Sequence, residues 1–179
     1  MDAAFDRFRD WMNQIETTAR ENYDEVRIHL FSDHDMAVTQ HDSRMMPEFE
    51  SLGLKYGTDY AAVWDPTMVR FWFPGGDKVK AQVTAWLNDR EEGRIVSDEE
   101  LKANGCLFPS GRYGELWYLL PEGTIFAPSF MNQRHVTGMH GYDPREPASA
   151  ACWLTNHTAC SSPARINEIY NVIREAADA

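Results

Sequence analysis

The first part of the chain alternates apolar and polar positions with the period of an α-helix. Apolar side chains recur every three or four residues and would share one helical face: Phe5, Phe8, Met12, Ile15 and Ala19. This pattern predicts a helix over residues 3–22. The next apolar run, residues 26–31, is short and β-branched, which is typical of a buried strand. A helix that leads into a buried strand indicates an α/β fold.

The middle of the chain shows further strand and helix patterns. Two short apolar runs, residues 60–64 and 68–73, are separated by a tight Asp-Pro turn and predict a hairpin. Apolar residues at helical spacing then predict a helix over residues 77–89. Proline and glycine interrupt residues 41–58, so this segment is expected to be an irregular connection.

Three more elements are expected before the chain ends. Residues 97–100 have the Ser-x-x-Glu pattern of a capping box, which predicts a short helix. The runs 116–120 and 124–126 flank a Pro-Glu-Gly turn and predict a second strand pair. A last helix, started by a Ser-Pro pair, would bury one apolar face: Ile166, Ile169, Tyr170 and Ile173. No repeat or linker divides residues 1–179, which are expected to form a single domain.

Composition and charge limit the kinds of function that the chain is expected to have. The chain has 179 residues, of which 43% are hydrophobic and 25% charged, as in an ordinary soluble domain. With 17 basic and 28 acidic residues its formal charge is −11, which disfavours binding to duplex nucleic acid. The three widely spaced cysteines do not form a disulfide framework. The absence of an apolar leader or membrane span predicts a cytoplasmic location without membrane contact.

Two segments are rich in side chains that bind metals. Asp33 and His34 follow the first predicted strand, and His140 lies in the glycine-containing segment 137–144. Imidazole and carboxylate groups suit zinc or manganese, and a pair of such ions can assist phosphoryl transfer. Alternatively, the first segment is a polar turn and the second holds a solvated loop histidine.

Both segments resemble motifs of the alkaline phosphatase superfamily. Phe-Ser-Asp-His-Asp-Met at residues 31–36 resembles the family's Ser-Asp-His-Gly-Met segment, and Gly-Met-His-Gly-Tyr-Asp at residues 138–143 resembles Thr-His-Gly-Tyr-Asp of its type I phosphodiesterase/nucleotide pyrophosphatase branch. The resemblance implies that Asp33 and His34 bind one zinc of a pair and His140 the other, with manganese as a second candidate metal. It also implies an alkaline-phosphatase-like layered sheet with flanking helices, of which this chain would be the C-terminal part.

The resemblance does not extend to the family's nucleophile. In that family the nucleophile, the first metal-binding aspartate and an Asp-x-x-x-His ligand pair precede the Ser-Asp-His motif, whereas the 32 residues before Asp33 contain no Asp-x-x-x-His. We therefore expect a truncated form of a metal-dependent phosphodiesterase or nucleotide pyrophosphatase-like hydrolase, inactive as a separate chain, with no catalytic residue assigned. Asp35 replaces the family's glycine, and its carboxylate could bind metal, repel phosphate or distort the loop.

Other interpretations of the sequence stay open. The chain could be a non-catalytic binding module that keeps a partial metal site, or an α/β interaction domain in which the two motifs are coincidental. A small-molecule phosphodiester is the expected substrate of the full site, and a homodimer would cover apolar edges. His29 is expected to have a structural role within its strand. His135 and His157 are either solvated or orient a metal ligand.

Overall fold

A computed structural model describes residues 2–178 of the protein. The chain falls into two compact units. The larger unit is continuous and spans His34–Ala150, whereas the smaller unit combines the chain up to Asp33 with the chain from Ala151 onward. The single domain expected from the sequence stays a prediction.

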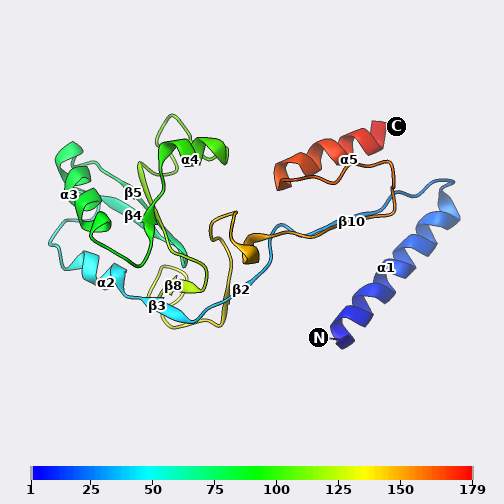
Figure 1. Ribbon diagram of the computed structural model, residues 1–179, viewed down its shortest axis with the longest axis horizontal. Helices are drawn as coiled ribbons and strands as arrows, with labels where there is room; N and C mark the ends of the chain where they lie inside the picture. Colours follow the sequence, from blue (N-terminus) through cyan, green and yellow to red (C-terminus); the bar gives the residue numbers. More distant parts are fainter. Residues whose placement is uncertain (1, 179) are drawn as a thin grey trace. The chain divides into compact units, whose positions relative to one another are not determined.

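The larger unit contains an antiparallel sheet of four strands in the order β4-β5-β7-β6 (Figure 1). In chain order, its elements are β2 (Ala37–Val38), β3 (His41–Ser43), α2 (Met45–Glu50), β4 (Ala61–Trp64), β5 (Met68–Trp72), α3 (Asp77–Asn88), β6 (Arg94–Ile95), α4 (Asp98–Ala103), β7 (Leu116–Leu119), β8 (Thr124–Phe126), β9 (Gly138–Met139) and the 3-10 turn Pro147–Ser149. The predicted hairpin of β4 and β5 and the predicted helix α3 are confirmed.

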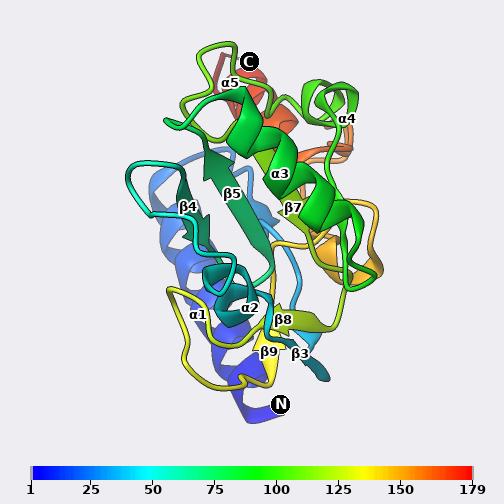
Figure 2. The same ribbon diagram turned by 90° about the vertical axis from the view of Figure 1, so that its left-hand side faces the viewer.

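One apolar core supports this sheet. Alternate residues of β4 and β5 are buried, so one face of the sheet is apolar, as the two-residue period of a strand requires. Helices α2 and α3 pack on the same core, and Figure 2 shows α3 lying across the sheet. Five fully buried side chains come from three of these elements, α2, β5 and α3: Phe49, Val69, Phe71, Val83 and Leu87. The core therefore fixes the sheet and two helices as one block.

The predicted strand pair of residues 116–120 and 124–126 is wrong. Both segments are strands, but β7 pairs with β5 on one edge and with β6 on the other. Because neither edge of β7 is left for another strand, β8 instead pairs in parallel with β3, with Asp42 opposite Ile125. The Pro-Glu-Gly turn therefore takes the chain out of the four-stranded sheet.

The segment 41–58 is also more regular than expected, because it contains β3 and helix α2. Met45 and Phe49 are separated by one helical turn, and both are buried in the core. Pro47 lies in the first turn of α2, where the missing N–H has no helical acceptor in any case. The helix therefore forms where proline and glycine had predicted an irregular connection, because it buries two large side chains.

The smaller unit contains α1 (Asp2–Asn22), β1 (His29–Phe31), β10 (Trp153–Thr155), the 3-10 turn Ile166–Glu168 and α5 (Ile169–Asp178). Strands β1 and β10 form an antiparallel ribbon in which His29 lies opposite Thr155. The predicted first helix is confirmed, and large side chains of its apolar stripe are exposed, with Phe5 at 67% and Ile15 at 60%. None of the described helices is long and apolar enough to cross a membrane.

The buried face predicted for the last helix is wrong, because the structure buries different residues. Ile169 and Val172 are buried, whereas Ile166, Tyr170 and Ile173 are exposed. The sequence pattern assumes one continuous α-helix, but residues 166–168 form a 3-10 turn, which has three residues per turn. This turn takes Ile166 off the buried face of α5. Within α5, Val172 follows Ile169 by three residues on the same side, whereas Tyr170 is rotated by about 100° from Ile169.

The core of the larger unit yields the first prediction. Replacement of Phe71 by alanine would leave a cavity among rings that are fully buried, so we expect Phe71→Ala to lower the free energy of unfolding by about 3–5 kcal/mol. Phe130→Ala is the matched control, because the Phe130 ring is 53% exposed and should contribute less than about 1 kcal/mol. Urea unfolding followed by circular dichroism measures both, and equal losses would contradict this assignment of the core.

Candidate functional site

The two motif segments meet through a short antiparallel ladder between β2 and β9. Ala37 lies opposite Met139, and Val38 lies opposite Gly138. His34 lies in the loop just before β2, and His140 directly follows β9. A Cβ atom at Gly138 would lie 3.2 Å from Cγ of Met36, so glycine keeps this approach open. Segments about a hundred residues apart thus lie side by side.

The ladder brings the rings of His34 and His140 into a parallel stack. Their centroids are 3.9 Å apart, and their planes differ by 13°. Because the lone pair of an imidazole nitrogen lies in the plane of the ring, stacked rings do not point at one ion between them. Each ring is suited to a different ion, and the ions of two-metal sites are typically about 3.5–4 Å apart. The arrangement therefore fits a donor set in which each histidine serves its own metal.

Local hydrogen bonds orient the first motif. Nδ1 of His34 lies 2.7 Å from the carbonyl oxygen of Asp35, so the tautomer with a proton on Nδ1 presents a lone pair on Nε2. The Asp35 carboxylate, which replaces the family's glycine, accepts the N–H of Met36 at 2.7 Å. The extra carboxylate thus has a backbone partner within its own loop.

The three predicted metal ligands differ in what the structure shows of them. His34 and His140 are brought together within the larger unit. Asp33 is an exposed residue that precedes His34 and ends the first segment of the smaller unit, so its place as a ligand stays a prediction. Among residues 2–178, no group of three or more histidine, cysteine and acidic side chains is placed to hold a metal ion.

Hydrogen bonds to two other segments hold the second motif after His140. The carbonyl of Gly141 accepts the hydroxyl hydrogen of Thr67 at 2.8 Å. The buried Tyr142 donates its hydroxyl to the carbonyl of Thr124 at 3.1 Å. Burial raises the pKa of Tyr142 to about 12, so its phenol stays neutral and keeps this hydrogen at neutral pH. The backbone that carries His140 is therefore tied to β8 and to the turn before β5.

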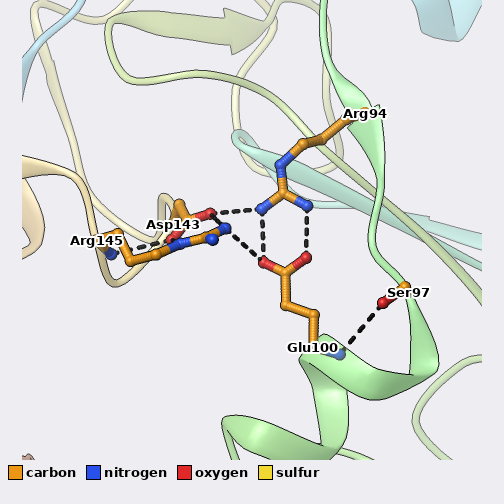
Figure 3. A network of polar contacts seen from close by, with 5 residues as sticks. All are labelled: Arg94, Ser97, Glu100, Asp143 and Arg145. Carbon is orange, nitrogen blue, oxygen red and sulfur yellow. Dashed lines mark hydrogen bonds and ion pairs between the residues drawn. The ribbon is translucent and has the colours of Figure 1, made fainter.

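Asp143 ends the motif as a buried carboxylate in a network of charges with partly exposed partners (Figure 3). Its carboxylate accepts hydrogen bonds from the backbone N–H and the side chain of Arg145 and from Arg94. Arg94 also binds both carboxylate oxygens of Glu100 at 2.6 Å. Hydrogen bonds from Arg145 and Arg94 hold the pKa of Asp143 well below its usual range, although burial opposes the shift. Since Arg94 lies on β6 and Glu100 on α4, the network ties the motif to the edge of the sheet.

His135, another histidine of the larger unit, pairs with a carboxylate. Nδ1 of His135 lies 2.6 Å from Oδ1 of Asp42, and its Nε2 lies 3.3 Å from the hydroxyl of Thr39. The pair joins the segment before β9 to strand β3. The sequence left His135 as either a solvated histidine or one that orients a ligand, because nothing in the chain indicates that residues so far apart meet.

The comparisons with known proteins identify structural neighbours. No protein-family model matches this sequence, and no curated protein matches it. Two crystal structures of phosphonoacetate hydrolase from Sinorhizobium meliloti 1021, in complex with phosphonoacetate and with phosphonoformate, are similar in structure. Both have a TM-score of 0.59, with 16% and 15% sequence identity, over 86% of this chain and 42% of the hydrolase chain. This similarity establishes an α/β fold of alkaline-phosphatase-like type, and the chain spans less than half of the hydrolase's length.

The charge network yields a prediction on pH dependence. Because the pKa of Asp143 is lowered in the folded chain, its ion pairs stabilise the fold above the carboxyl's unfolded pKa of about 4, and this stability is lost as pH falls toward the folded value. We expect Asp143→Asn to lower the free energy of unfolding by about 1–2 kcal/mol at neutral pH, because the remaining arginines are partly exposed, and by progressively less below about pH 4. Urea unfolding at several pH values measures this difference. Asp89→Asn, at an exposed position, is the control, and a loss for Asp143→Asn that does not depend on pH would contradict the ion-pair explanation.

Proposed function

We propose that this chain provides metal ligands to a metal-dependent hydrolase site of the phosphodiesterase or nucleotide pyrophosphatase type. The observation that carries the proposal is the stack of His34 and His140, because two motifs that resemble one family's metal-binding segments meet in space. The shared fold with phosphonoacetate hydrolase supports a reaction at a tetrahedral phosphorus centre. Zinc is the proposed metal, with manganese as the second candidate.

In this proposal His34 and Asp33 serve one ion and His140 serves the other. A bound pair of such ions would neutralise charge on the phosphoryl oxygens and activate a nucleophile. The chain's own contribution is orientation: the carbonyl of Asp35 fixes the tautomer of His34. Contacts to Gly141, Tyr142 and Asp143 keep the backbone beside His140 in place. No nucleophile is assigned among residues 2–178.

The second candidate function is a binding module that keeps a partial metal site without turnover. One observation favours it, since residues 2–178 contain no group of three or more side chains placed to hold a metal. An ion held by a single imidazole is bound more weakly than one with a full ligand set. In both functions the proposed small-molecule ligand is a phosphodiester or a related phosphonate, and its acidic groups would approach the two imidazoles.

A zinc-binding experiment tests the proposal. We expect the purified chain to bind zinc in equilibrium dialysis, and we expect His34→Ala and His140→Ala each to remove one class of binding site. His41→Ala is the matched control, because His41 is an exposed histidine on β3 in the same unit. Far-UV circular dichroism confirms that each variant is folded. Zinc binding that is unchanged in both His34→Ala and His140→Ala would refute the proposal.

Hydrolysis assays on the same samples separate the two functions. Bis-p-nitrophenyl phosphate tests phosphodiester cleavage, and phosphonoacetate tests cleavage of a carbon–phosphorus bond. We expect zinc binding without turnover of either compound by the separate chain, because no nucleophile is assigned. Zinc-dependent turnover that disappears in His140→Ala would show that the chain holds a complete active site and would exclude the binding-module function.

A further inference from the structure

Helix α1 of the smaller unit leaves its apolar face uncovered. Four large side chains of this helix are exposed to between 39% and 67%: Phe5, Phe8, Trp11 and Ile15. An amphipathic helix gains most of its stability when its apolar face is packed, so this face indicates a contact with another protein surface. We propose that it pairs with the same face of a second copy of this chain, with the two helices antiparallel. The proposal uses none of the residues of the motif site, so it is independent of the function proposed above.

The spacing of the apolar residues on α1 favours another helix as the occupant of this face. Phe5, Phe8, Met12, Ile15 and Ala19 are separated alternately by three and four residues, and a mean repeat of about 3.5 keeps a narrow apolar seam facing a partner helix. A helix that packs on a globular core has a wider stripe. Figure 1 shows α1 as one uninterrupted helix, so the seam is continuous over all five residues.

The sizes of the seam residues distinguish between the two ways of pairing the helices. Antiparallel pairing about a twofold axis places Phe8 against Ala19 of the second copy, so a large ring meets the smallest seam residue. It also places Met12 against Ile15 of the second copy. Parallel pairing would place Phe8 against Phe8 and Ala19 against Ala19, which crowds one layer and leaves a cavity in another. The side-chain volumes therefore favour the antiparallel arrangement.

The charges beside the seam favour the same arrangement. Arg9 and Glu16 lie two helical turns apart on one flank of the seam. In the antiparallel pair this flank meets its own copy, so Arg9 faces Glu16 of the second copy, and the twofold axis repeats the contact. In a parallel pair the same flank would meet the opposite one, whose residues are uncharged: Ala4, Trp11 and Thr18. Only the antiparallel pair is complementary in charge.

The ion pairs within α1 leave both side chains accessible to a second copy. Nη1 of Arg9 lies 3.1 Å from Oδ1 of Asp6, and Oε1 of Glu16 lies 2.6 Å from Nη2 of Arg20. These side chains are all exposed, and exposed ion pairs contribute little to stability. A guanidinium also has five donors, so Arg9 can contact Asp6 and the second copy together.

Sedimentation velocity of the full chain over a range of concentrations tests the proposal. We expect a reversible dimer, and we expect Ile15→Glu to raise its dissociation constant at least about 100-fold, because each dimer would bury two unpaired carboxylates. Leu154→Glu is the matched control and should leave the dimer unchanged, since Leu154 lies on β10 of the same unit and is 61% exposed, against 60% for Ile15. Far-UV circular dichroism confirms that both variants keep their helix content.

Three outcomes of this experiment would overturn the proposal. A chain that is monomeric at every concentration would mean that a different protein covers this face. A dimer that Ile15→Glu leaves intact, or that Leu154→Glu weakens as much, would mean that the chains associate through another surface.

Charge-exchange variants test the antiparallel alignment. Arg9→Glu alone and Glu16→Arg alone should each raise the dissociation constant about 10-fold, because each turns two attractions across the dimer into two repulsions. The double variant Arg9→Glu/Glu16→Arg restores opposite charges between the copies and should recover most of the affinity. Since the pairs within each helix stay broken in the double variant, a local effect on α1 would not be recovered. Single variants without effect, or a double variant as weak as either single one, would overturn the antiparallel pairing.

Discussion

The ladder between β2 and β9 is the constraint on which the candidate site depends. It is only two residues long on each side, yet it sets the register that places His140 beside His34. A shift of one residue would turn alternate side chains to the opposite face of the ladder. So short a ladder cannot hold its register alone, and the contacts of the residues that follow His140 provide the missing stability.

These contacts make the two halves of the site unequal. The second motif is tied to the rest of the larger unit through Thr67, Thr124 and Arg94, which come from three different parts of that unit. The first motif is bonded at Ser32, which exchanges two hydrogen bonds with Cys152, and within its own loop at Asp35. The two halves of the site therefore depend on different supporting segments.

The sequence predicted those elements whose signals are local. Ser97 does accept the N–H of Glu100, and the hairpin and the helix after it lie where the pattern placed them. The partner of β8 was missed because strand pairing depends on which edges are occupied, and local patterns do not carry that information. His34 and His140 were predicted through the resemblance of their motifs. The ion pair between Arg94 and Asp143 was not, because it joins residues that are 49 positions apart.

The long separation of the two strands of the ladder has a consequence for the order of folding. Closing a loop of about a hundred residues carries a large entropic cost, which is reduced only when the residues in between have already become compact. The four-stranded sheet and its helices lie within that loop, so their collapse must come first. The ladder then forms after the sheet and, with few hydrogen bonds of its own, opens before it. Amide exchange at Ala37 and Met139 would therefore report on assembly of the site separately from the stability of the core.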